Sequence, residues 1–170
     1  MTAVRVGIVG TGSVASSVHL PILTRRTDLF EIVALADLNI SAAHALADRF
    51  GITQADCFAD PKAMLAAQEM DAVVILNSGS HAEVVELALR AGKTVFCEKP
   101  LAYTRAEMKA IEKAKSESGS NLMIGYMKTF DPAVLEAKKA IKSRPRTVDV
   151  LVLHPSGDSQ LVTSDESLNM

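Results

Sequence analysis

The sequence predicts an α/β protein built on a doubly wound parallel sheet. Short β-branched runs with continuous apolar character, suited to burial on both faces, alternate with longer helical stretches. Repeated strand–helix–strand order with right-handed connections places helices on both faces of such a sheet. A chain of 170 residues with 48% hydrophobic and 22% charged residues is long enough to bury a core of its own.

Five apolar runs are predicted as strands and six stretches between them as helices. The strands are 4–9, 31–36, 72–76, 94–97 and 122–125. The helices are 14–25, 41–50, 61–68, 81–91, 105–116 and 132–142. A further strand is expected at 147–153, and residues 155–170 are polar. The C-terminal part therefore looks like the start of another layer.

Capping signals support the predicted ends of these helices. Two starts have the hydroxyl and glutamate spacing of a capping box, namely Ser80 with Glu83 and Thr104 with Glu107. Two others place a capping aspartate before a first-turn proline, Asp60-Pro61 and Asp131-Pro132. Glycines that favour a left-handed stop follow two helices, Gly51 and Gly92.

The charge and composition exclude several classes of partner. With 18 Lys and Arg against 20 Asp and Glu, the chain lacks the positive excess that nucleic acids or anionic membranes demand. Cys57 and Cys97 form neither a disulfide framework nor a metal-ligand spacing, so no metal is predicted. No apolar run reaches the length of a membrane span. We expect a cytoplasmic protein in a reducing compartment.

The first predicted strand runs directly into a glycine loop, Gly10-Thr11-Gly12-Ser13-Val14-Ala15. In the G-x-G-x-x-A pattern the first glycine permits a tight turn, and the second lets the backbone approach a pyrophosphate. The small Ala15 allows close packing of helix on strand. The loop predicts a dinucleotide at the helix N-terminus, within a Rossmann fold. The alternatives are a purely structural turn or a different nucleotide-like ligand.

Asp37 follows the second predicted strand, 25 residues after Gly12. A carboxylate at this place can accept hydrogen bonds from the adenosine ribose hydroxyls and would repel a 2′-phosphate. The next residues, Leu38 and Asn39, offer no guanidinium for such a phosphate. NAD is therefore favoured over NADP. As an alternative, Asp37 caps the helix that begins near Asn39.

Two later strand ends carry the residues expected to do chemistry, because ligands of doubly wound sheets bind beyond the carboxyl ends of strands. The loop 76–81 should place Asn77 and Ser78 beside the cofactor and project the ring of His81 toward the site. The alternative for His81 is a solvated histidine at a helix start.

The second of these strand ends is Cys97-Glu98-Lys99-Pro100. Lys99 at this end can hydrogen-bond a substrate hydroxyl and assist its proton transfer. A surface ion pair of Glu98 with Lys99 is the alternative. Cys97 is expected to be a small buried apolar residue.

Several stretches together resemble the glucose–fructose oxidoreductase and inositol dehydrogenase (Gfo/Idh/MocA) family. They are 6–12, 33–37, 78–83, 98–101 and 125–128 with Asp131-Pro132. The resemblance implies oxidation or reduction of a hydroxyl of sugars, polyols or nucleotide sugars with NAD or NADP. It implies that Lys99 is the substrate-contacting catalytic lysine and that Glu98 and His81 lie beside the nicotinamide ribose. Tyr126 and Lys128 would face the substrate.

The chain departs from this family in three places. Leu76-Asn77 stands where the family has Thr-Pro, and Thr129 where it has Arg. Family enzymes continue into a sheet domain that carries an Asp and a His of the site, and His154 does not match that pattern. We therefore expect residues 1–120 to form a dinucleotide-binding domain. Residues 121–170 would supply its last strand, a connecting helix and the beginning of a truncated substrate domain.

Two functions from different classes follow. One is an NAD-dependent oxidoreductase that acts on a hydroxyl of a sugar, polyol or nucleotide sugar. The other is a truncated non-catalytic NAD-binding module that pairs with another chain, or with a second copy, through an exposed strand edge. A methyltransferase is a third class, since it also uses a glycine loop and a ribose-binding acid. Lys99-Pro100 argues against it.

Overall fold

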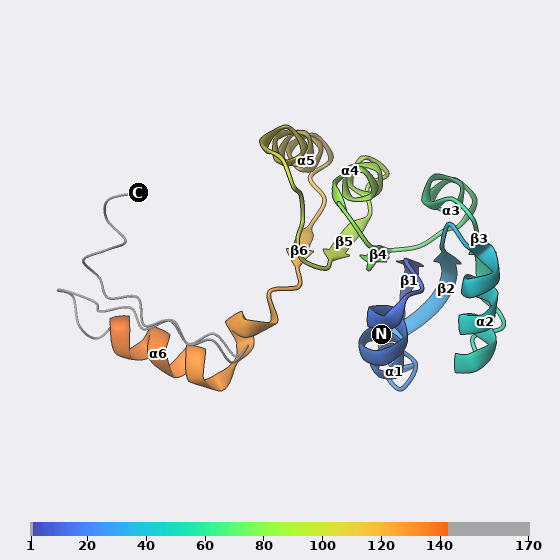
Figure 1. Cartoon of the computed structure of the whole chain (residues 1–170), viewed down its shortest axis with the longest axis horizontal. Coiled ribbons are helices and arrows are strands. Elements are labelled where there is room, and N and C mark those ends of the chain that lie inside the picture. Colours follow the sequence, from blue (N-terminus) through green and yellow to red (C-terminus); the bar gives the residue numbers. More distant parts are fainter. Residues whose placement is uncertain (1, 143–170) are drawn as a thin grey trace. The chain divides into compact units, whose positions relative to one another are not determined.

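The computed structural model describes residues 2–142, which divide into two units between Tyr126 and Met127. The first unit is a parallel sheet with helices on both faces (Figure 1). Its strands are β1 (Val4–Val9), β2 (Phe30–Ala36), β3 (Asp56–Phe58), β4 (Ala72–Ile75), β5 (Thr94–Cys97) and β6 (Leu122–Ile124). Its helical segments are η1 (Ala15–His19), α1 (Leu20–Leu23), α2 (Ile40–Phe50), α3 (Pro61–Ala67), α4 (Ala82–Arg90) and α5 (Arg105–Ser118).

The six strands lie in the order β3-β2-β1-β4-β5-β6, and every neighbouring pair is parallel. The chain moves outward from β1 to β3, then crosses back to β4 and moves outward again. A crevice forms at the carboxyl ends of β1 and β4, where the direction reverses, and this is the place where such sheets bind ligands. The predicted fold class is therefore confirmed for the described residues.

Consecutive residues of the central strands enter two different hydrophobic cores. In β4, Val73 and Ile75 pack with α3, α4 and α5, whereas Val74 and the following Leu76 pack on the face covered by η1, α1 and α2. Figure 1 shows these two layers on opposite sides of the sheet. Because both faces are covered, the strands read as continuous apolar runs.

The structure corrects three of the sequence expectations. β3 was not predicted as a strand, although it pairs with β2 from Asp56 to Phe58. The helix expected at 14–25 is the π-helical turn η1 followed by the short α1. Ser80 and Glu83 form no capping box: the Ser80 hydroxyl accepts the N–H of Ala82, not that of Glu83, and donates to Glu107.

Other capping expectations are met. Thr104 and Glu107 form the predicted capping box at α5. Asp60 accepts the backbone N–H of Lys62 at the start of α3. The left-handed residue Gly51 ends α2.

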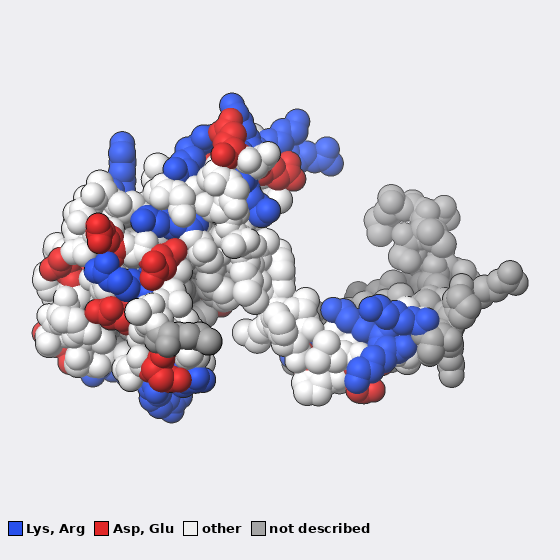
Figure 2. Space-filling view, turned by 180° about the vertical axis from the view of Figure 1, so that it is seen from behind, with Lys and Arg blue, Asp and Glu red and all other residues white. Residues whose placement is uncertain are grey.

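The second unit contains η2 (Met127–Phe130) and α6 (Pro132–Lys142). Asp131 accepts the Ala133 N–H before α6, as its position before Pro132 predicts. The strand expected at 147–153 and His154 lie outside the described residues. Figure 2 shows acidic and basic side chains intermixed on one face of the first unit, while lysines gather on α6.

Candidate functional site

The two glycines of the loop after β1 meet different surroundings. Gly10 has φ 91°, and a Cβ there would lie 2.4 Å from the backbone nitrogen of Asn77. Gly10 is therefore required by the fold itself, since it lets β1 and the loop after β4 touch. A Cβ on Gly12 would meet no atom within 4 Å. The open space at Gly12 suits a ligand approaching the backbone, and Ala15 behind it is fully buried.

Asp37 lies at the carboxyl end of β2 and faces the glycine loop. Its Oδ2 accepts hydrogen bonds from the backbone N–H and the hydroxyl of Thr11, both at 2.8 Å, and its Oδ1 accepts the Asn39 N–H at 2.9 Å. Burial alone would raise the pKa of Asp37, but these three hydrogen bonds outweigh it and hold the pKa below its usual value. The carboxylate is thus ionised and fixed. Asn39, not Asp37, occupies the cap position of α2.

A cleft of about 470 Å³ opens at the crevice between β1, β2 and β4. Gly10, Gly12, Asp37, Asn77 and Ser78 all line it, so the structure brings together five of the predicted cofactor-binding residues. Asp60 and Glu83, which the sequence analysis did not select, also line the cleft. No Lys or Arg is among the described residues that line it. Three carboxylates without a cation disfavour a phosphate on the ribose.

The remaining loop residues stand around this cleft. Thr11 is buried and joined to Asp37, while Ser13 and Val14 are exposed in the turn where the helix begins. These exposed positions, with the free backbone N–H groups of a helix start, can receive a diphosphate.

The loop after β4 is tied down by long-range hydrogen bonds. The Ser80 hydroxyl donates to Glu107 Oε1 at 2.7 Å, across 27 residues. Three further bonds, from the Tyr103 and Thr104 N–H groups and the Thr104 hydroxyl, reach Glu107 Oε2. The Ser80 hydroxyl and these donors lower the pKa of Glu107. The loop is therefore anchored to the start of α5.

Asn77 stiffens the same loop from within. Its Nδ2 donates to the carbonyls of Ser78 and Ser80, at 3.1 and 3.4 Å. Its buried Oδ1 has no hydrogen-bond partner among the described residues. The Asn77 amide thus holds the loop through its own hydrogen bonds.

His81 is buried, with only 3% of its surface exposed, so it is not the solvated histidine of the alternative. Its Nδ1 donates to the carbonyl oxygen of Pro100. This bond joins the loop after β4 to the segment that follows Lys99. His81 therefore fixes the position of that segment, and a direct contact with a cofactor or substrate stays a prediction.

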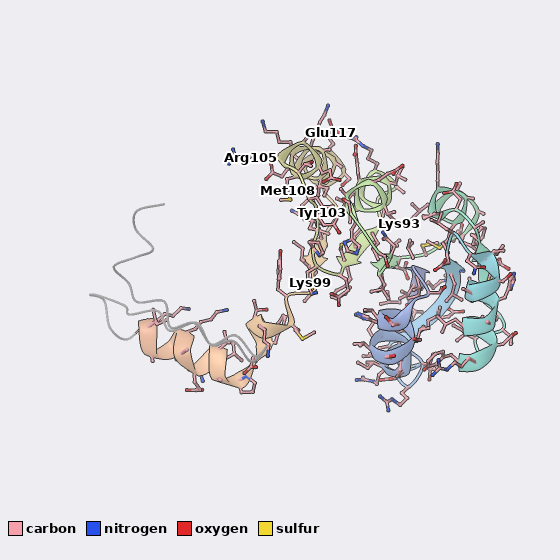
Figure 3. The ribbon with its side chains drawn as sticks, in the orientation of Figure 1. Lys93, Lys99, Tyr103, Arg105, Met108 and Glu117 are labelled. Carbon is pink, nitrogen blue, oxygen red and sulfur yellow. The ribbon has the colours of Figure 1, made fainter. Side chains whose placement is uncertain are left out.

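Glu98 and Lys99 follow β5, which pairs with β4. Lys99 is labelled in Figure 3. The Glu98 carboxylate does not pair with the Lys99 ammonium. Its Oε2 accepts the Lys99 backbone N–H at 3.1 Å, and its Oε1 lies 3.2 Å from His19 Nε2. Lys99 is exposed, and among residues 2–142 its ammonium has no partner. The surface ion pair of Glu98 with Lys99, given as the alternative, is therefore not formed among the described residues.

His19 is the residue of this group that the sequence analysis missed. It stands 79 residues before Glu98 and belongs to the helix after the glycine loop, so no local pattern links the two. The available signal was Pro21 inside the predicted helix, because a proline there disturbs the backbone and marks an irregular turn.

The predicted substrate-side residues fall in different units. Tyr126 lies just after β6 in the first unit and is 53% exposed. Lys128 lies in η2 of the second unit, where its ammonium is 3.6 Å from Asp131. Their contact with a substrate stays a prediction.

Residues 2–142 contain no group of three or more His, Cys, Asp or Glu side chains that could hold a metal ion. Nor does any helix in this range have the length and apolar character needed to cross a membrane.

Comparisons with known proteins identify several relatives. An inositol 2-dehydrogenase/D-chiro-inositol 3-dehydrogenase of Shouchella clausii is 36% identical over 141 residues, which are 82% of this chain and 40% of the relative. The crystal structure of myo-inositol dehydrogenase from Lactobacillus casei in complex with NAD(H) and myo-inositol matches with a TM-score of 0.79 and 28% identity, over 88% of this chain and 44% of that one.

A third relative was solved with a nucleotide sugar. The WlbA dehydrogenase of Bordetella pertussis, in complex with NADH and UDP-GlcNAcA, matches with a TM-score of 0.76 and 29% identity. The match covers 88% of this chain and 44% of that one. This chain thus spans less than half the length of the proteins it matches.

A family model also matches residues 4–126, which is nearly all of the first unit. The model describes an oxidoreductase family with an NAD-binding Rossmann fold. The match confirms the resemblance inferred from the motifs and decides against a methyltransferase. The chain belongs to the Gfo/Idh/MocA oxidoreductase family.

Proposed function

We propose that this chain is an NAD⁺-dependent dehydrogenase that acts on a hydroxyl group of a sugar, polyol or nucleotide sugar. The observation that carries the proposal is the open space at Gly12 beside the fixed carboxylate of Asp37. A side chain at Gly12 would fill the very space that a diphosphate needs, and the adjoining cleft is of a size for a bound nucleoside.

NAD⁺ is favoured over NADP⁺ by the charges of the cleft. Asp37 is ionised and held by three hydrogen bonds from Thr11 and Asn39, so it cannot swing away from an added phosphate, while about one acceptor position is left for a ribose hydroxyl. Asp60 and Glu83 add negative charge to the lining. The 2′-phosphate of NADP⁺ would therefore meet repulsion without a compensating cation.

We propose that Lys99 contacts the substrate. When bound, NAD⁺ supplies an acceptor for the hydride that an alcohol carbon releases. Lys99 hydrogen-bonds the substrate oxygen and assists the loss of its proton as the carbonyl forms. Glu98 and His81 position this lysine, Glu98 through the Lys99 N–H and His81 through the Pro100 carbonyl. Tyr126 and Lys128 are proposed to contact the substrate.

The substrate class follows from the relatives. The Lactobacillus casei enzyme was solved with myo-inositol and the Bordetella pertussis enzyme with UDP-GlcNAcA. Both ligands contain a ring with secondary hydroxyl groups. A hydroxyl of this kind is the group that Lys99 would help to deprotonate. We propose that the first unit, ending at Tyr126, binds the cofactor and that the substrate domain begins after it. The free thiols of Cys57 and Cys97 suit a reducing cytoplasm.

Calorimetry and turnover on the same preparation test the proposal. NAD⁺ should release or absorb heat on binding to the 170-residue chain, and NADH should form when myo-inositol or UDP-GlcNAcA is added. Lys99→Ala should lower turnover by about 100-fold or more while the NAD⁺ dissociation constant changes less than about twofold. Lys109→Ala, at an exposed position of α5, is the matched control and should change neither.

Each other outcome has a defined meaning. If the chain binds NAD⁺ without any turnover, the alternative of a non-catalytic module that pairs with another chain gains support. If Lys99→Ala weakens NAD⁺ binding and turnover equally, Lys99 is a cofactor ligand rather than a catalytic residue. Absence of any heat with NAD⁺ or NADH would overturn the proposal.

A further inference from the structure

His19, the last residue of the π-helical turn η1, contacts the carboxylate of Glu98, which directly follows β5. His19 Nε2 lies 3.2 Å from Glu98 Oε1, and both side chains are only 17% exposed. The imidazole ring also packs edge-on against Phe96 of β5, with the ring centroids 5.4 Å apart. A contact held by packing and largely shielded from water is worth more than an exposed surface pair.

The irregular helix is what places His19. Pro21 has no N–H to donate, and its ring would clash with the carbonyl four residues earlier in a regular α-helix. The chain responds with the π-helical turn η1, in which the Leu20 N–H bonds to the Ala15 carbonyl five residues back. Such turns insert an extra residue and occur often at functional sites. Here the turn ends at His19, on the side of the helix that meets β5.

The Glu98 carboxylate is confined from three sides. His19 holds Oε1, and the Lys99 N–H holds Oε2 at 3.1 Å. A Cβ on Gly125 would lie 3.2 Å from Glu98 Oε1 and 3.1 Å from the Phe96 ring, so the backbone just after β6 packs against the pair. A carboxylate accepts about four hydrogen bonds in all, and two of its positions are taken here. The other acceptor positions remain for a ligand.

We propose that His19 is a positioning residue for the dinucleotide. It holds the Glu98 carboxylate so that its remaining acceptor positions serve hydroxyl groups of the ribose next to the nicotinamide, and so that the Lys99 backbone stays in place. This inference rests on the proposed NAD⁺ binding. It predicts that His19 acts only through Glu98 and only on the half of the dinucleotide that lies beyond the diphosphate.

Binding of two ligands to the full chain tests this role. NAD⁺ carries the second ribose and the nicotinamide, whereas ADP carries only the adenosine and the diphosphate. His19→Leu keeps a side chain of similar size against Phe96 but removes the hydrogen bond. Calorimetry should show NAD⁺ binding weakened about three- to tenfold, as loss of one such bond predicts, with ADP binding changed less than about twofold.

Two further variants separate positioning from a merely structural role. His19→Gln keeps an N–H donor at a similar reach and should restore most of the NAD⁺ affinity, whereas the shorter His19→Asn should not. In a Glu98→Met background, His19→Leu should weaken NAD⁺ by less than about twofold, because the group that it positions is gone. His44→Leu, at an exposed place on α2, is the control for loss of a histidine.

The outcomes distinguish this inference from the proposed function. Equal weakening of NAD⁺ and ADP by His19→Leu, or multiplicative effects of the His19 and Glu98 substitutions, would overturn the positioning role while NAD⁺ binding stands. If His19→Leu does not fold, the contrast between His19→Gln and His19→Asn decides. A wild-type chain that binds neither ligand overturns the proposed function itself.

Discussion

Asp37 and Glu98 each follow a strand of the same sheet, but their carboxylates are held by different means. Asp37 accepts three hydrogen bonds from Thr11 and Asn39, and two of the donors are backbone N–H groups. Glu98 accepts one backbone N–H from its neighbour and depends for the other bond on the imidazole of His19. The first carboxylate is fixed mainly by the main chain of two adjoining loops, and the second by a side chain from a distant helix.

The same contrast holds for the loops around these residues. Gly10 contacts the Asn77 backbone directly, so the side of the cleft near Asp37 is built from main chain against main chain. The side near Lys99 is joined by the Ser80–Glu107 and His81–Pro100 bonds, which span 27 and 19 residues. Main-chain contacts persist through most substitutions, whereas side-chain bonds are lost with a single one. The region around Lys99 is therefore the part that sequence change can adjust most easily.

The largest effects are expected for the two glycines of the loop after β1, one on NAD⁺ affinity and the other on stability. Gly12→Ala should reduce NAD⁺ affinity by about 100-fold, since a methyl group would occupy the diphosphate space, while the unfolding free energy stays within about 0.5 kcal/mol of wild type. Gly10→Ala should lower the unfolding free energy by about 2–5 kcal/mol, because its positive φ and close backbone contact leave no room for a Cβ. Urea unfolding and calorimetry measure both quantities. Loss of stability in Gly12→Ala would show that its open space is needed by the fold and not by a ligand.

A smaller effect on cofactor affinity is expected when the carboxylate of Asp37 is removed. Asp37→Ala should weaken NAD⁺ about tenfold and bring the NADP⁺ affinity close to that of NAD⁺, because both the ribose acceptor and the repulsion of a 2′-phosphate disappear. Thr11→Val removes one donor to Asp37 and keeps the carboxylate, so it should change NAD⁺ affinity only a fewfold. Calorimetric titrations of wild type and both variants with NAD⁺ and NADP⁺ measure these affinities. Unchanged preference in Asp37→Ala would assign the discrimination to Asp60 and Glu83.

The smallest expected effect is on the stability in acid. The pKa of Asp37 is lowered in the folded chain, so the folded state binds its proton at a lower pH than the unfolded state does. The ionised carboxylate therefore stabilises the fold above its ordinary pKa of 3.8, and this stabilisation disappears as the pH falls through the lowered value. The difference in unfolding free energy between wild type and Asp37→Asn should be constant near neutral pH and shrink below about pH 4. A difference that grows on acidification would contradict the assigned hydrogen bonds.

The sequence predicted the parts of the fold that local chemistry determines. The apolar run of β1, the glycines after it and the acid after β2 belong to one short pattern with a physical reason for each member. Thr104 and Glu107 form their capping box within four residues of chain. Such features need no knowledge of distant contacts.

The expectations that were wrong or missing concern distant contacts. β3 has three residues and exists because β2 offers an edge for pairing, so the segment 56–58 carries no strand pattern of its own. Ser80 has the spacing of a capping box with Glu83, but its hydroxyl donates to Glu107, which stands 27 residues away. His19 could not be assigned from sequence, because its partner stands 79 residues away.

Cys97 shows a further consequence of the way in which β5 is buried. The thiol is fully enclosed and lies beside Glu98, and burial followed by the negative charge of Glu98 raises its pKa to about 12. At neutral pH almost none of it is thiolate, which is the form that peroxides and alkylating reagents attack. A sulfur atom two residues from Lys99 is thereby kept inert for as long as the strand stays in the sheet.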